Sequence, residues 1–172
     1  MSEHQEIENL LNETRTFAPT KEFSSHAIAQ PDIYDHAKKD RLEFWADRAN
    51  ELHWHKPFTE VLDFSNAPFA KWFSDGELNI SYNCLDRHVE AGWGKRVALF
   101  FEGEPGDTKV YTYLDLLQAV KKAANVLIKM GVEPGDRVAI YLPMIPEAII
   151  AMQAVARIGA VHSVVFGGFS AE

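Results

Sequence analysis

Residues 138–166 hold two short apolar runs on either side of a longer apolar segment, and this arrangement strongly limits the fold. The first run is Val138–Leu142, and the second is Val161–Phe166, which only two polar residues interrupt. Between them, residues 147–158 contain only three polar side chains, which predicts a largely buried helix. Strands that are apolar along their whole length are typical of parallel sheets covered on both faces. The sequence therefore predicts a β-α-β unit and an α/β fold.

Two consecutive glycines, Gly167 and Gly168, follow the second apolar run directly. They are expected at the carboxyl end of a parallel strand, which is where open α/β sheets bind ligands. The alternative is that both glycines serve only a tight turn. The pair does not form the G-x-G-x-x-G pattern, so the sequence does not predict a dinucleotide-binding loop.

Composition excludes several classes of function. The chain has 172 residues and a net charge of −8 without a dense basic block, which argues against nucleic acid or an anionic membrane as the partner. A single cysteine, Cys84, cannot form an internal disulfide or a metal site of several cysteines. No apolar run reaches the length of a membrane span, and we expect a cytoplasmic protein.

The segment after Gly94 has a regular pattern. Residues 96–101 and 110–112 are expected to form a hairpin around a type II turn at Gly103–Asp107. Thr112 is expected to cap a helix that ends at Gly131. Asp115, three residues after Thr112, is in the capping-box position. The buried stripe of this helix should consist of Leu116, Leu117, Val120, Ala123, Ala124, Leu127 and Met130. Residues 133–136 should form a second type II turn.

The first 93 residues are less regular and are interpreted as an extension. Residues 1–31 are expected to be a tail, with a short helix at 7–11. Residues 32–52 have helical spacing and predict one helix, or two helices with a break near Asp40.

Residues 53–80 are rich in aromatic residues and prolines, and they predict an irregular segment with one strand at 69–73. Residues 79–91 should form another helix, capped by Ser81 and ended by Gly92. We therefore place the domain boundary near Gly94. The second part, 94–172, is expected to be the incomplete beginning of a larger α/β domain, because no helix follows the last strand to cover it.

Three groups of side chains invite a chemical interpretation, and each has a plainer alternative. His53 and His55 could share one strand face and bind metal, but no third ligand is nearby, so we predict no metal site. Cys84 and His88 are four residues apart, but packing explains them as well as nucleophilic chemistry. His162, inside an apolar strand, is more often structural than catalytic.

Several segments together resemble the AMP-forming acetyl-CoA synthetases, which are adenylate-forming acyl-CoA synthetases. The resemblance runs in the same order from about residue 32 to the end of the chain. FAKWF at 69–73 is similar to the N-terminal extension of short-chain acyl-CoA synthetases. The other segments are YNCLDRH at 82–88, EGEP at 102–105, GDRV at 135–138, LPMIPE at 142–147 and ARIGAVHSVVFGGFS at 156–170.

The resemblance implies an N-terminal portion of a ligase. The fold would be a helical or irregular extension, residues 1–93, followed by the first β-α-β part of the large domain. The complete enzyme would convert acetate, ATP and CoA to acetyl-CoA, AMP and pyrophosphate through acetyl-AMP, with Mg²⁺ supporting the first step. The phosphate-binding loop and the adenylation lysine of the family lie beyond Glu172, so no catalytic residue is assigned.

Only three residues match family positions that lie beside the CoA nucleotide: Phe166, Gly167 and Gly168. Their role would be steric, and no cofactor is expected to bind tightly to these 172 residues alone. Two alternatives remain open. One is a propionyl- or other short-chain acyl-CoA synthetase, and the other is a stand-alone interaction module that associates with itself through exposed apolar faces.

Overall fold

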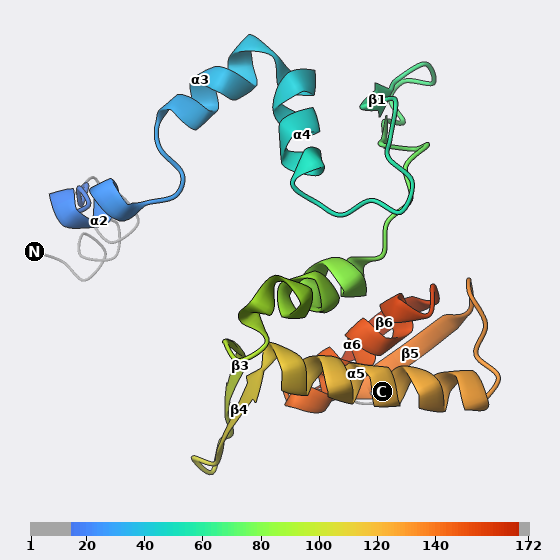
Figure 1. Ribbon diagram of the computed structural model, residues 1–172. Helices are drawn as coiled ribbons and strands as arrows, with labels where there is room; N and C mark the ends of the chain where they lie inside the picture. Colours follow the sequence, from blue (N-terminus) through green and yellow to red (C-terminus); the bar gives the residue numbers. More distant parts are fainter. Residues whose placement is uncertain (1–14, 169–172) are drawn as a thin grey trace, which may run out of the picture. The chain divides into compact units, whose positions relative to one another are not determined.

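The computed structural model describes residues 15–168, and the chain divides into two compact units, Met1–Phe44 and Trp45–Glu172. Figure 1 shows the order of the elements, and each unit is described by itself. In the part of the chain that the structure describes, no helix combines the length and the apolar character needed to cross a membrane.

The first unit contains helix α2 (Lys21–His26), helix α3 (Asp32–Lys39) and the start of helix α4 (Arg41–Asn50). Helix α2 lies in the segment that was predicted to be a tail, and its cap explains it: the Thr20 hydroxyl accepts a hydrogen bond from an amide of the first turn. The helix expected at residues 7–11 lies outside the described residues.

The predicted break near Asp40 is confirmed. Asp40 has extended backbone angles, φ −148° and ψ 102°, between α3 and α4. Its carboxylate accepts hydrogen bonds from the amides of Leu42 and Glu43, both at 2.9 Å. Asp40 therefore ends one helix and caps the next.

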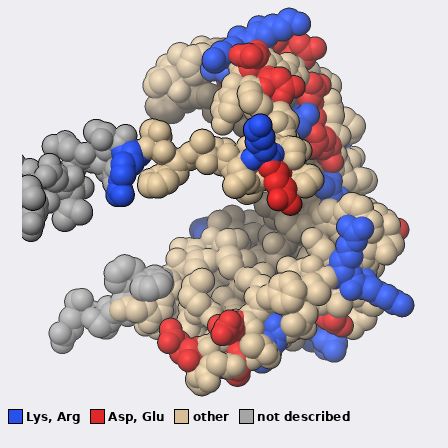
Figure 2. Space-filling view, turned by 90° about the vertical axis from the view of Figure 1, so that its left-hand side faces the viewer, with Lys and Arg blue, Asp and Glu red and all other residues tan. Residues whose placement is uncertain are grey.

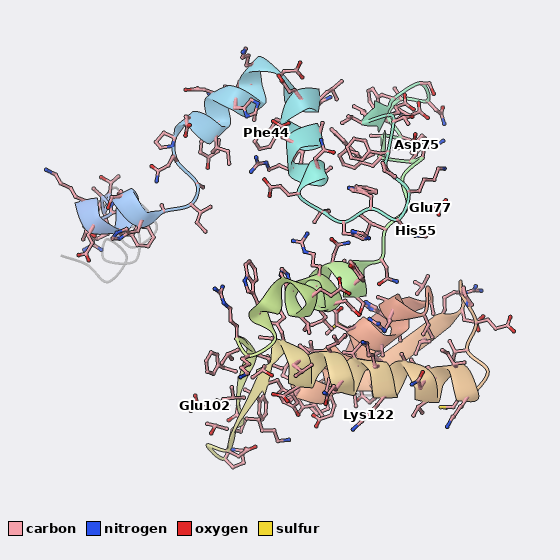
Figure 3. The ribbon with its side chains drawn as sticks, in the orientation of Figure 1. Phe44, His55, Asp75, Glu77, Glu102 and Lys122 are labelled. Carbon is pink, nitrogen blue, oxygen red and sulfur yellow. The ribbon has the colours of Figure 1, made fainter. Side chains whose placement is uncertain are left out.

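In the second unit, residues 51–79 form an irregular segment around aromatic rings that meet edge-on or tilted. Strands β1 (Leu62–Asp63) and β2 (Lys71–Trp72) pair antiparallel, so the strand predicted at 69–73 is shorter than expected. The His55 amide donates to the Glu77 carbonyl at 2.8 Å, and Figure 3 labels both residues on adjoining stretches. The rings of Trp54, Phe58 and Phe73 lie within 4.8–5.9 Å of one another.

The helix expected at residues 79–91 is present, but most of it is π-helical. It contains η1 (Tyr82–Asp86) and η2 (Val89–Trp93). The prediction that Ser81 caps it is wrong: Ser81 already has helical angles, and its buried hydroxyl has no hydrogen-bond partner. The Asn79 side chain accepts from the Tyr82 amide instead, at 3.1 Å. Gly92 has φ +84°, as expected of a helix stop.

Strands β3 (Val97–Glu102) and β4 (Thr108–Thr112) form the predicted antiparallel hairpin. Its turn is not type II, because the Gly106 amide bonds the Gly103 carbonyl and so places Pro105 third in the turn. Gly106 has φ +86° and forms a three-residue loop with a bulge. The second predicted turn is type II, since the Asp136 amide bonds the Glu133 carbonyl at 3.1 Å and Gly135 has φ +89°.

Helix α5 (Tyr113–Lys129) begins with the predicted capping box. The Thr112 hydroxyl accepts from the Asp115 amide, and the Asp115 carboxylate accepts from the Thr112 amide. Of the predicted stripe, Leu116, Leu117, Val120 and Ala124 are buried, and Ala123 and Leu127 are half-buried. Met130 is 75% exposed, so its predicted burial is wrong, because the packing partners of the stripe end before it does.

The predicted β-α-β unit is confirmed. Strand β5 (Arg137–Leu142) pairs parallel with β6 (Val161–Phe166), and helix α6 (Pro146–Arg157) joins them. Helix α5 packs against α6 beside this unit (Figure 1). The core of these elements and of the preceding π-helix consists of Leu85, Leu116, Leu117, Val120, Ala124 and Ala154.

The β5–β6 sheet is less covered than expected, since the sequence predicts helices over both of its faces. Burial alternates along β5, where Ile140 is buried and Tyr141 is 59% exposed. On β6, Val161, Val164 and Val165 are all at least 40% exposed. The expected coverage of both faces is therefore not found among residues 15–168, where α6 covers one face. The domain boundary placed near Gly94 stays a prediction.

Candidate functional site

A groove of about 920 Å³ lies at the carboxyl ends of β5 and β6. The end of the β3–β4 hairpin forms one part of its wall, the loop after β5 and the first turns of α6 form another, and Gly167 and Gly168 complete it. This is the edge where the sequence predicted ligand binding. Its lining is mostly apolar and includes Phe100 and Met144, which are 75% and 84% exposed.

Gly167 lies against the backbone of the neighbouring strand. A Cβ atom at this position would be 3.3 Å from the Leu142 carbonyl oxygen and 3.4 Å from the Pro143 Cα. A side chain would therefore press on backbone atoms that cannot move away easily. Close packing of β6 on β5 is enough to explain this glycine, whereas Gly168 contributes to the groove lining. The side chain of Phe166 lies outside the described part of the chain.

The charged residues of the groove are mainly acidic. Glu102, Glu104 and Asp107 come from the hairpin, where Figure 3 labels Glu102, and Lys109 is the only basic residue in the lining. Lys109 Nζ lies 3.8 Å from a carboxylate oxygen of Glu147, and both side chains are about half exposed. In Figure 2 the lower part of the molecule is largely tan, with both acidic and basic side chains along its edges.

The last turn of α6 is held by a polar cluster that sequence reasoning missed. Arg157 donates two hydrogen bonds to the Asp86 carboxylate, at 2.6 and 3.0 Å, and Asp86 is 6% exposed. Lys121 Nζ, on α5, lies 3.8 Å from the same carboxylate. The Asn79 amide donates to the Ala156 and Arg157 carbonyls at 3.1 and 3.2 Å. We call the side chains of Asn79, Asp86 and Arg157 the α6 clamp.

No local sequence signal could have identified the α6 clamp. Asp86 and Arg157 are 71 residues apart, and no pattern of neighbouring residues connects them. The one available signal is Arg157 itself, because a basic residue in the last turn of a helix interacts favourably with the helix dipole.

The structure does not join the histidines and the cysteine into a reactive site. His53 and His55 are exposed, and the described residues contain no group of three His, Cys, Asp or Glu that could hold a metal ion. His162 is exposed on β6.

Cys84 is half-buried, and the His88 ring lies among aromatic rings. It stacks on Trp93 with ring centroids 5.5 Å apart and lies 5.1 Å from the Tyr113 ring. Burial, and then the positive charge of Arg87, lowers the pKa of His88 from its ordinary value. The surroundings of His88 fit the packing interpretation.

Sequence comparison divides the chain between two families. Residues 30–84 match the family described as acetyl-coenzyme A synthetase N-terminus, and residues 85–172 match the AMP-binding enzyme family. The chain belongs to the AMP-binding enzyme family. The match includes every element that surrounds the groove, from the hairpin to the glycines after β6.

Curated relatives of this chain carry the name acetyl-coenzyme A synthetase. The protein from Streptomyces avermitilis is 59% identical over 169 residues, which are 98% of this chain and 26% of that protein. The protein from Mycobacterium tuberculosis is 62% identical over 157 residues, which are 91% of this chain and 24% of that protein. The protein from Burkholderia lata is 58% identical over 172 residues.

These matches confirm the resemblance to acetyl-CoA synthetases. The chain spans about a quarter of the length of the relatives.

Proposed function

We propose that these 172 residues are the N-terminal quarter of an AMP-forming acetyl-CoA synthetase. The complete protein would join acetate to CoA, with cleavage of ATP to AMP and pyrophosphate. One observation carries the proposal: 59% identity to an acetyl-coenzyme A synthetase extends over 98% of this chain. It therefore includes the α/β elements that form the groove as well as the extension before them.

The groove supports a steric role beside CoA for the residues after β6. Its apolar lining and the absence of a side chain at Gly168 suit an uncharged part of a ligand that lies against the backbone. The charges do not suit the phosphates of CoA, because three carboxylates accompany a single lysine. We therefore assign to Phe166, Gly167 and Gly168 only the shape of this edge, and we assign phosphate binding to none of the groove residues.

ATP and Mg²⁺ do not fit the residues at hand. The sequence has no G-x-x-x-x-G-K-[ST] loop, and the acidic groove would repel a triphosphate. The described residues offer no cluster of three metal-binding side chains. We therefore derive no step of the reaction through either group and assign no catalytic residue to this chain.

The test uses the complete gene product that begins with this chain. We expect acetate-dependent exchange between ATP and pyrophosphate, and CoA-dependent release of AMP. Comparison of the exchange rates with acetate and with propionate gives the acyl preference. It distinguishes an acetyl-CoA synthetase from a propionyl-CoA synthetase. A pure, folded protein without carboxylate-dependent exchange would refute the proposal and favour an interaction module.

Residues 1–172 alone provide the matching negative control. We expect no exchange activity, and CoA binding weaker than about 1 mM by calorimetric titration, because charged phosphate contacts are missing. Micromolar CoA affinity would contradict the assignment of the groove. Two further proposals accompany the function: a cytoplasmic location, and the domain division at residue 93.

A further inference from the structure

Helix α6 connects the groove to the α6 clamp. Its first turns contribute Pro146, Ala148 and Ile149 to the groove, and its last turn carries Arg157. The helix has 12 residues, which correspond to a length of about 18 Å. Because a helix of this length moves nearly as a rigid rod, a contact at its last turn also sets the position of its first turn.

The apolar contacts of α6 hold it against α5 and the sheet, and polar contacts can add a direction to this packing. Its buried side chains are small, and they include Ala148, Ala154 and Val155. Dispersion contacts between such side chains are weak individually and not directional. Directional contacts therefore add to this packing in selecting one rotation and one axial position of the helix.

The α6 clamp supplies such directional contacts. The guanidinium of Arg157 meets the buried Asp86 carboxylate with two hydrogen bonds, which fix both its distance and its plane. Asn79 bonds the last two carbonyls of α6, and it also caps the π-helix that carries Asp86. One side chain thus ends one helix and begins the other.

The contact at the groove end of α6 is much weaker. Lys109 and Glu147 are 3.8 Å apart and half exposed, and pairs of this kind contribute little. Of the ion pairs that the structure describes on α6, the one at Asp86 is therefore the pair that can orient the helix. The groove depends on contacts made at the opposite end of α6.

We propose that Asp86 and Arg157 are positioning residues for the CoA side of the groove: they hold α6 in the orientation that shapes its wall, without touching the ligand. The inference rests on the proposed function. It also gives the segment before residue 94 a role, since Asp86 and Asn79 come from the helix at its end. Weakening the Asp86–Arg157 pair should therefore raise the KM for CoA and leave the rate of adenylation unchanged.

The experiment compares variants of the complete gene product that begins with this chain. Asp86→Asn removes the charge and keeps the shape, and Arg157→Lys keeps the charge and loses the paired hydrogen bonds. Lys121→Gln is the matched control, because it removes only the longer, half-exposed contact with the same carboxylate. For each protein we would measure the KM for CoA, acetate-dependent ATP–pyrophosphate exchange and the melting temperature.

We expect Asp86→Asn and Arg157→Lys to raise the KM for CoA about threefold to tenfold, while the exchange rate is unchanged and Lys121→Gln resembles the wild type. The double variant Asp86→Asn, Arg157→Gln should be no worse than Arg157→Gln alone, because the two side chains act as one unit. Hydrogen exchange at residues 143–149 should become faster in the single variants.

Three results would overturn the inference. The first is a folded variant with a lower melting temperature but an unchanged KM for CoA, which indicates a purely structural pair. The second is an equal loss of exchange and of CoA use, and the third is failure of even Arg157→Lys to fold. If the wild type itself lacks acetate-dependent exchange, the proposed function fails first, and the inference fails with it.

Discussion

The side chain of Asn83 pairs with the backbone of His53 as a neighbouring strand would. Its Oδ1 accepts from the His53 amide at 2.8 Å, and its Nδ2 donates to the His53 carbonyl at 2.9 Å. Asn83 is 7% exposed, and it also bonds the Asn79 carbonyl. The Asn83 side chain thus attaches the irregular segment of the second unit to the π-helix, and Arg87 adds a hydrogen bond to the Glu51 carbonyl at 2.8 Å.

Replacement of Asn83 by alanine should therefore destabilise the protein. The change removes three hydrogen bonds made by a buried side chain, two to the His53 backbone and one to the Asn79 carbonyl, and should cost about 1–3 kcal/mol in total. Urea unfolding monitored by circular dichroism would measure the loss. Asn125→Ala is the matched control, because Asn125 is exposed on α5. Equal stability of the two variants would contradict the prediction.

Gly76 is needed because an aromatic ring lies directly over its backbone. A Cβ atom there would be 2.6 Å from Trp54 Cζ3 and 3.1 Å from Phe58 Cβ. We expect Gly76→Ala to lower the free energy of unfolding by about 1–3 kcal/mol, since the rings must shift. In Gly94→Ala the new Cβ would meet its neighbours at 3.6 Å in a helical backbone, so that control should be neutral or slightly stabilising. Similar losses in both variants would refute the steric argument.

The elements that sequence reasoning predicted correctly are those whose signals are local. The capping box at Thr112 and Asp115 spans three residues, and the β5–α6–β6 unit follows from two apolar runs with a helix-length segment between them. The turn at 133–136 is likewise fixed by Pro134 and Gly135 within four residues. In each case, neighbours in sequence make the contacts that determine the structure.

The features that were missed depend on distant partners. The Asp86–Arg157 pair joins residues 71 apart, and the bonds of Asn79 to the end of α6 span 77 and 78 residues. The cap that Asn79 forms with the Tyr82 amide is local, and an asparagine is as good a cap as the serine that was preferred. Met130 continues a helical pattern but has no partner for burial. The groove was predicted only at its Gly167–Gly168 edge, because the hairpin that completes it comes from elsewhere in the sequence.

Gly167 offers a direct test of the groove edge. In Gly167→Ala the new Cβ would lie 3.3 Å from the Leu142 carbonyl oxygen, and overpacking against backbone should cost about 1 kcal/mol or more. Because the strain falls on the β5–β6 pairing, thermal unfolding should occur at a lower temperature than in Ser163→Ala, a control on the same strand. If Gly167→Ala is as stable as the control, close packing does not explain this glycine.

His88 should make stability depend on pH below neutrality. Burial of the ring, and secondarily the charge of Arg87, lowers its pKa from 6.5, whereas the unfolded chain keeps the ordinary value. Between these two values the unfolded state binds more protons, so protonation favours unfolding. The contribution of neutral His88 to the free energy of unfolding is therefore fully present above pH 6.5. It is lost as the pH falls through the pKa of the folded state.

Substitution of His88 by glutamine should consequently flatten the pH profile of stability. We expect the wild type to lose more unfolding free energy than His88→Gln when the pH is lowered from about 7 to about 5. Urea titrations at several pH values would measure both slopes. His55→Gln, the same substitution at an exposed histidine, is the matched comparison. Parallel profiles for the wild type and His88→Gln would show that the folded protein does not resist protonation of His88.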